Sequence, residues 1–145
     1  MRILIPTLIA IALACSAWTL QAQQSQGFGP YEIHYNTLNT NLLSPDVASV
    51  YGIQRAGTQA MLNITVLEKQ SGQAVPARVS ATAVNLTGQR RDIELREVRD
   101  QDAIYYIGQF RIHDQENLNF SLDINPDGHS GAPYKLTFRQ QFFTG

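Results

Sequence analysis

Apolar and polar residues alternate with a period of two along most of the chain after residue 30. Seven segments show this alternation: residues 31–35, 60–68, 75–83, 91–98, 103–112, 118–124 and 134–142. In the first of them Tyr31, Ile33 and Tyr35 share one face, and Glu32 and His34 share the other. Such alternation is typical of antiparallel strands that bury one face and expose the other. The pattern therefore predicts seven strands.

The stretches between these strands are rich in turn-forming residues. They include "KQSGQ", "LTGQ", "HDQEN" and "NPDGHSGAP". Short strands joined by turns of this kind, with almost no helical periodicity, favour an all-β fold. We expect an immunoglobulin-like antiparallel β-sandwich, with a small barrel as the alternative.

One segment, Ser44 to Tyr51, predicts a short helix. The hydroxyl of Ser44 can cap the first-turn N–H groups, and Pro45 suits the first helical position. Asp46 lies near the positive end of the helix dipole. Gly52 can adopt the left-handed conformation that ends a helix.

The apolar residues of this helix are Val47, Val50 and Tyr51, which the spacing places on one face. A helix of two turns is too short to be stable alone, so it has to pack on the sheets. We expect that face to close one end of the sandwich. The Asn- and Thr-rich residues just before the helix, 36–41, have no such structural explanation in the sequence.

The N-terminus has the organisation of a secretory signal peptide. Arg2 is followed by an apolar run from residue 3 to residue 17, and "LQA" ending at Ala22 provides small residues for cleavage. The run is shorter than the roughly 20 residues of a membrane span. We predict a signal peptide at residues 1–22, a single β-sandwich domain at 23–145 without a transmembrane segment, and a periplasmic location.

Cys15 offers an alternative route to the envelope. In "ALAC" it could be the acylated cysteine of an outer-membrane lipoprotein. The lipoprotein pattern prefers Leu three residues earlier, but that position is Ala12, and Leu13 is one residue too late. Signal peptide cleavage is therefore the favoured interpretation, and a lipid anchor is disfavoured.

Composition and charge exclude some classes of partner. The 145 residues are 43% hydrophobic and 16% charged, with a formal net charge of -1. The charge-rich stretch at residues 90–102 mixes arginines with aspartates and glutamates. A nucleic-acid surface would be strongly basic, so we expect none here.

Two patterns suggest metal ligands, and both have a simpler explanation. "DINPDG" resembles the start of a calcium loop, but the twelfth position is Tyr134 rather than Glu. Its Asn-Pro-Asp-Gly portion favours a turn between strands. The three histidines, His34, His113 and His129, match no compact ligand spacing. We therefore predict no metal or other cofactor.

Much of the mature chain resembles a family of uncharacterised exported proteins of Gram-negative bacteria. The resemblance rests on "HYN", "LSPDVASVYGI" and "LNITV", together with "FRQQFF" near the end. That family is known only as a domain of unknown function. The resemblance implies a periplasmic, immunoglobulin-like domain and brings no activity, cofactor or catalytic residue.

No set of catalytic residues is evident in the sequence, so we expect a binding module rather than an enzyme. The leading hypothesis is an exported domain that binds another envelope component, with a protein as the expected partner. Its candidate surface is the polar face and exit of the first strand: His34, Asn36, Asn39 and Asn41. The alternative is a small-ligand carrier or enzyme with a pocket near His34 at one end of the sandwich. A concave pocket that joins His34 to a second ionisable side chain would favour that alternative.

Overall fold

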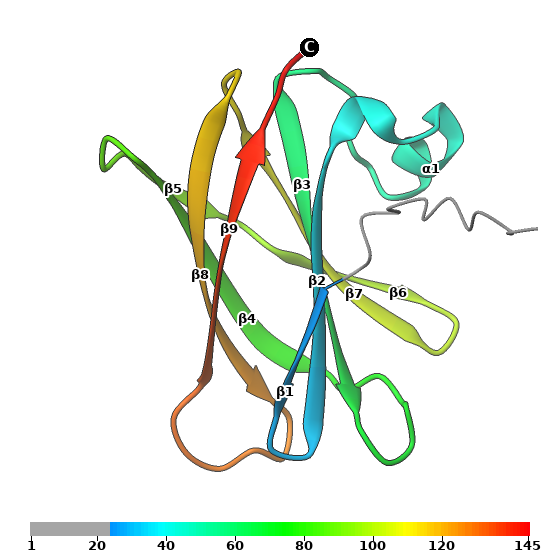
Figure 1. The fold of residues 1–145 in the computed structure, drawn as a ribbon. Helices are drawn as coiled ribbons and strands as arrows, with labels where there is room; N and C mark the ends of the chain where they lie inside the picture. The colour runs from blue at the N-terminus through cyan, green and yellow to red at the C-terminus, as the bar shows by residue number, and fades with distance from the viewer. Residues whose placement is uncertain (1–23) are drawn as a thin grey trace, which may run out of the picture.

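Two antiparallel sheets pack face to face in the computed structural model, which describes residues 24–145 (Figure 1). The predicted signal peptide, its cleavage site after Ala22 and Cys15 lie outside the described residues. The strands form two separate sheets rather than one closed sheet. The expected immunoglobulin-like β-sandwich is thus confirmed.

The larger sheet has five strands and the smaller sheet has four. In spatial order the larger sheet contains β1 (Gln24–Phe28), β2 (Tyr31–Asn39), β3 (Gln59–Glu68), β7 (Ala103–Arg111) and β6 (Arg96–Asp100). The smaller sheet contains β5 (Arg90–Ile93), β4 (Ala77–Asn85), β8 (Glu116–Pro126) and β9 (Tyr134–Phe142). Between β2 and β3 lie a 3-10 turn, η1 (Thr40–Leu42), and the helix α1 (Pro45–Val50).

The period-two alternation puts one face of each sheet into a shared core. The largest fully buried side chains come from both sheets and include Ile33, Leu62, Ile64, Phe120 and Leu136. Aromatic rings join the layers at the edge formed by β2 and β9. There the ring of Tyr35 lies 4.6 Å from that of Phe138, centroid to centroid, a distance typical of packed aromatic pairs.

Residues 24–145 form nine strands where seven were predicted, and β1 is one of the two additions. Four of its five residues are exposed, so it has no apolar alternation that a sequence pattern could reveal. It pairs with β2 from Gln24 opposite Tyr35 to Phe28 opposite Tyr31. Backbone hydrogen bonds, rather than side-chain burial, place this strand in the sheet.

The second addition arises because the predicted strand at residues 91–98 is two strands. Residues Arg90–Ile93 belong to the smaller sheet as β5, and Arg96–Asp100 belong to the larger sheet as β6. The chain crosses from one layer to the other at Glu94 and Leu95. The crossing passes Gly108 of β7.

Helix α1 begins and ends as the sequence predicts. The Ser44 hydroxyl accepts a hydrogen bond from the Val47 N–H at 3.2 Å. At the other end Gly52 has a φ of 64°, and the Ile53 N–H bonds to the Ala48 carbonyl at 2.7 Å. This is the hydrogen-bond pattern of a glycine-terminated helix.

The predicted buried face of the helix is wrong for two of its three residues, since Tyr51 packs as expected but the two valines do not. Ala48 is the buried residue of α1, whereas Val47 is 41% exposed and Val50 is 79% exposed. Ala48 packs with Ile53, Met61 and Ile107 in a cluster separate from the main core. The helix therefore covers the outer face of the larger sheet and does not close the end between the layers (Figure 1). Because α1 has only six residues and Ala48 is the one of them that is buried, Val47 and Val50 remain exposed to solvent.

We expect Ser44→Ala to lower the free energy of unfolding by about 1 kcal/mol, because the Val47 N–H loses its acceptor. Urea unfolding followed by circular dichroism measures this change. Ser49→Ala, on an exposed position inside the same helix, is the matched control and should be neutral or slightly stabilising. Equal effects of the two substitutions would contradict the capping role.

A candidate ligand site on the outer face of the larger sheet

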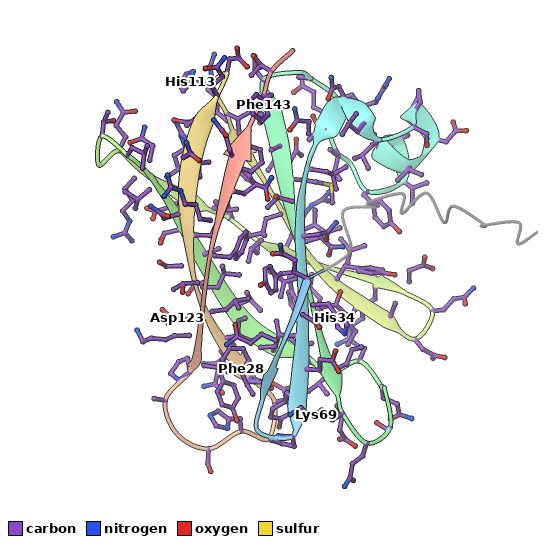
Figure 2. The ribbon with its side chains drawn as sticks, viewed as in Figure 1. Phe28, His34, Lys69, His113, Asp123 and Phe143 are labelled. Atoms are coloured by element: carbon purple, nitrogen blue, oxygen red, sulfur yellow. The ribbon has the colours of Figure 1, made fainter. Side chains whose placement is uncertain are left out.

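Four polar side chains lie next to one another on the outer face of the larger sheet. On β2 this face carries His34 and Asn36, because their odd-numbered neighbours Ile33 and Thr37 point into the core. Strand β3 pairs with β2 so that Thr65 lies opposite His34 and Asn63 lies opposite Asn36. Figure 2 shows His34 on the side of β2 that faces away from the smaller sheet.

Three of these side chains contain oxygen atoms that are buried without a hydrogen-bond partner among residues 24–145. We call the residues the polar row: Asn36, Asn63 and Thr65. The atoms are the amide oxygens of both asparagines and the Thr65 hydroxyl oxygen. Buried polar atoms are nearly always paired, since leaving one unpaired costs about 1–3 kcal/mol. Three such atoms in adjacent positions therefore need an explanation.

The polar row adjoins a hollow of about 400 Å³. We call it the outer-face hollow, and its lining is His34, Thr65, Leu67, Gly72, Ala74, Asp102, Ala103 and Tyr105. Thr65 belongs to both the row and the hollow, whereas Asn36 and Asn63 lie beside it without lining the hollow. The walls come from four segments: β2, β3, the β3–β4 loop and the start of β7.

Acidic side chains lie in and beside the hollow, and Arg99 lines a neighbouring hollow that shares Asp102 with it. Asp102 lines the outer-face hollow directly, and the Glu32 carboxylate lies 3.3 Å from the Nε2 atom of His34. The His34 side chain is 23% exposed and that of Glu32 is 41% exposed. The hollow thus joins His34 to a second ionisable residue, Asp102. A pocket that joins His34 to a second ionisable side chain was expected of the alternative function, a small-ligand carrier or enzyme, although this hollow lies on the outer face of the larger sheet and not at one end of the sandwich.

The other two predicted surface residues lie elsewhere. Asn39, at the end of β2, donates a hydrogen bond from Nδ2 to the Phe143 carbonyl at 2.6 Å. Asn41 lies in η1, where its carbonyl accepts a hydrogen bond from Arg55 at 3.2 Å. Of the four predicted residues, the structure therefore brings His34 and Asn36 together and uses Asn39 and Asn41 to hold the corner before α1.

Sequence reasoning missed Asn63, Thr65, Asp102 and Tyr105. Asn63 and Thr65 are the polar positions that alternate with Leu62, Ile64 and Val66, so their outward orientation was available from the pattern. Their position opposite Asn36 and His34 depends on the β2–β3 register across a 19-residue connection, which no sequence pattern specifies.

The residues weighed as metal ligands are dispersed. His34 lies part-way along β2, and His113 lies near Phe143 at the top of the view in Figure 2. The ring of His129 stacks on that of Tyr134 with centroids 4.3 Å apart. The Asp123 carboxylate lies 3.6 Å from Lys135 Nζ. Within residues 24–145 no three His, Cys, Asp or Glu side chains form a group that could hold a metal ion.

Comparison with known proteins gives a family and a fold. The family model described as "Domain of unknown function (DUF4426)" matches residues 25–145. The crystal structure of a DUF4426 family protein from Pseudomonas aeruginosa PAO1 is 35% identical and superposes with a TM-score of 0.75. The match covers 86% of this chain and 97% of that one. No curated protein matches the sequence significantly.

FetP of uropathogenic Escherichia coli strain F11 has the same fold at much lower identity. The protein as isolated, after recombinant expression in the periplasm, is 14% identical with a TM-score of 0.63, covering 83% of this chain and 93% of FetP. A copper-bound FetP variant gives 14% and 0.62, covering 83% and 95%. Among the described residues of this chain, neither helical segment has the length or apolarity to cross a membrane.

Proposed function

We propose that this chain, which belongs to the DUF4426 family of unknown function, is an exported periplasmic binding protein. Its ligand site is the polar row together with the outer-face hollow. The signal-peptide pattern at residues 1–22 supports export. We do not extend the copper of FetP to this chain, because 14% identity concerns the fold alone.

The observation that carries the proposal is the set of three buried oxygens without partners in the polar row. Carbonyl oxygens of asparagine only accept hydrogen bonds, so the missing partners are donors. Binding sites keep such unpaired groups at a cost in stability when a ligand supplies the partner. A ligand that reaches the row therefore presents N–H or O–H groups, and Thr65 is the member of the row that lines the hollow.

The nearby charges narrow the class of ligand further. Asp102 in the hollow and Glu32 beside His34 favour a positively charged group, since an isolated anion would be repelled there. Leu67, Ala74, Ala103 and Tyr105 add apolar area for a short carbon chain. A small amine or guanidinium compound fits both requirements.

The substitution Thr65→Val separates a ligand site from a structural one. It replaces an unpaired buried hydroxyl with a methyl group of nearly the same size. We expect the free energy of unfolding of the unliganded protein to rise by about 1 kcal/mol, and affinity for the ligand to fall at least tenfold. Thr137→Val, on the exposed outer face of the smaller sheet, is the matched control and should change neither quantity.

Agmatine, which carries one amine and one guanidinium group, is a suitable probe. In a ¹⁵N-labelled protein its addition should shift the amide resonances around Thr65, Asn63 and Tyr105. The same titration of Thr65→Val should give little change at these positions. Shifts spread over the acidic surface, or a Thr65→Val protein less stable than the natural one, would overturn the proposal.

A further inference from the structure

We propose that His34 couples ligand binding to pH, so that the outer-face hollow holds its cationic ligand near neutral pH and releases it in mild acid. This inference rests on the proposed function, because it concerns the same site. Its basis is the position of His34, whose side chain lines the hollow and also contacts the Glu32 carboxylate. Histidine is the side chain whose ordinary change of charge falls between pH 5 and 8.

The contact with Glu32 determines the hydrogen-bonding role of the neutral His34 ring. The Nε2 atom of His34 lies 3.3 Å from the Oε1 atom of Glu32. Because a carboxylate only accepts hydrogen bonds, this contact assigns the proton of the neutral ring to Nε2 and leaves Nδ1 as an acceptor. Neutral His34 therefore adds an acceptor to a surface where the Thr65 hydroxyl oxygen already lacks a partner within residues 24–145. An N–H group of a ligand matches both.

Protonation of His34 reverses this match in two ways. A protonated imidazole has two N–H donors and no acceptor, so it presents a donor to the donors of an amine. It also places a positive charge in the hollow, where it repels a cationic ligand. The charge of Glu32 is then paired with the imidazolium 3.3 Å away and attracts the ligand less. The His34 side chain is only 23% exposed, so water screens this repulsion incompletely.

The other groups around His34 keep their charge over the same pH range. Those that face it from the surrounding elements are Ser25 of β1, Glu32 of β2, Thr65 of β3, and Asp102 and Tyr105 of the hollow. Two cations lie beyond them: Lys69, whose Nζ is close to Gly27 of β1, and Arg99, which pairs with Glu97 at 3.4 Å. Carboxylates, tyrosines, lysines and arginines ordinarily change charge outside the range from pH 5.5 to 7.5. Among the described residues around the hollow, His34 is therefore the one that changes.

Titration of the ¹⁵N-labelled protein with agmatine at pH 7.5 and at pH 5.5 tests the proposal. Both basic groups of agmatine stay protonated at the two pH values, so a difference in affinity reports on the protein. The fold is intact at both, because the buried Glu116 carboxyl, whose pKa is lowered to about 2, remains ionised. Agmatine should bind about tenfold more weakly at pH 5.5, since most of the His34 rings are then protonated.

Two variants separate His34 from the other charges of the site. His34→Gln keeps a hydrogen-bonding side chain that has no change of charge, so its affinity for agmatine should be the same at the two pH values. Asp102→Asn is the matched control, because it removes the carboxylate of the hollow and leaves His34 in place. It should weaken binding at both pH values and keep the tenfold ratio between them.

The reciprocal measurement follows the His34 ring resonance against pH, with and without saturating agmatine. If proton and agmatine exclude each other, saturating agmatine should move proton uptake by His34 at least about one pH unit lower. His113 and His129 lie outside the hollow and should titrate unchanged in the same spectra. Equal agmatine affinity at the two pH values, or a pH effect that persists in His34→Gln, would overturn the coupling and leave the ligand site standing. No binding of agmatine at pH 7.5 would overturn the proposed function and the coupling with it.

Discussion

Replacing Gly108 with alanine is expected to lower the free energy of unfolding by about 3 kcal/mol. A Cβ atom on this residue would lie 2.6 Å from the Glu94 carbonyl oxygen and 2.7 Å from the Ile93 Cγ2 atom. Both contacts are shorter than atoms tolerate, and one of them is with backbone. Because the chain crosses between the sheets at this point, relief of the clash has to move β5, β6 or both.

Gly27→Ala is the matched control. Gly27 is also a strand residue, but an added Cβ would meet only the end of the Lys69 side chain, with Nζ at 3.0 Å. That flexible side chain can move, so the expected change is within about 0.5 kcal/mol. Urea unfolding followed by circular dichroism compares the two variants. If Gly108→Ala unfolds like Gly27→Ala, the crossing is not packed against β7 as described.

Gly108 also shows what sequence reasoning could and could not reach. The alternation at residues 91–98 is real, and Ile93 is buried as it predicts. Yet the chain changes sheets within that run, and the reason is a long-range one: a glycine 14 residues later leaves space for the crossing. A period of two reports which side chains face inward, and it does not report which sheet receives them.

The candidate site was likewise only partly predictable from local patterns. His34 and Asn36 were predicted from the polar face of β2, and the structure keeps them together. Asn63 and Thr65 become their neighbours only through the β2–β3 register. Local patterns therefore predicted most of the strands, and the nonlocal β2–β3 pairing assembled the candidate site.

Loss of the Glu116 carboxylate is expected to have the other large effect on stability, and this effect should depend on pH. Arg91 of β5 donates two hydrogen bonds to Glu116 of β8, at 2.8 and 2.7 Å. Asn85 of β4 donates a third to the same carboxylate at 3.1 Å, and the His113 N–H donates a fourth at 3.2 Å. The Glu116 side chain is only 9% exposed and that of Arg91 17%. Together with Asn85, the pair therefore links three strands of the smaller sheet, β4, β5 and β8.

These contacts determine the pKa of the Glu116 carboxyl. Burial raises the pKa of its carboxyl, but the hydrogen bonds from Arg91, Asn85 and the His113 N–H, with the Arg91 charge, outweigh burial. The pKa is lowered from 4.5 to about 2. A carboxyl whose pKa is depressed by folding stabilises the protein above its unfolded pKa. That contribution, roughly 3 kcal/mol, is present above pH 4.5 and is lost as the pH falls toward 2.

Glu116→Gln should accordingly lower the free energy of unfolding by about 3 kcal/mol at pH 7, because Arg91 is left buried without a counter-charge. The difference between the natural protein and the variant should shrink between pH 4.5 and 2, where the natural carboxylate takes up its proton. Urea unfolding at pH 7, 4.5, 3 and 2 measures this convergence.

Asp92→Asn is the matched control for this experiment. Asp92 also forms an ion pair on β5, 3.0 Å from Arg90, but the two side chains are 78% and 66% exposed. Exposed pairs contribute little because water screens them, so Asp92→Asn should change stability by less than about 1 kcal/mol at pH 7. A Glu116→Gln effect that stays constant from pH 7 to 2 would show that the side chain acts through packing alone. Convergence for Glu116→Gln, without it for Asp92→Asn, would locate the acid sensitivity of the smaller sheet in the buried carboxylate.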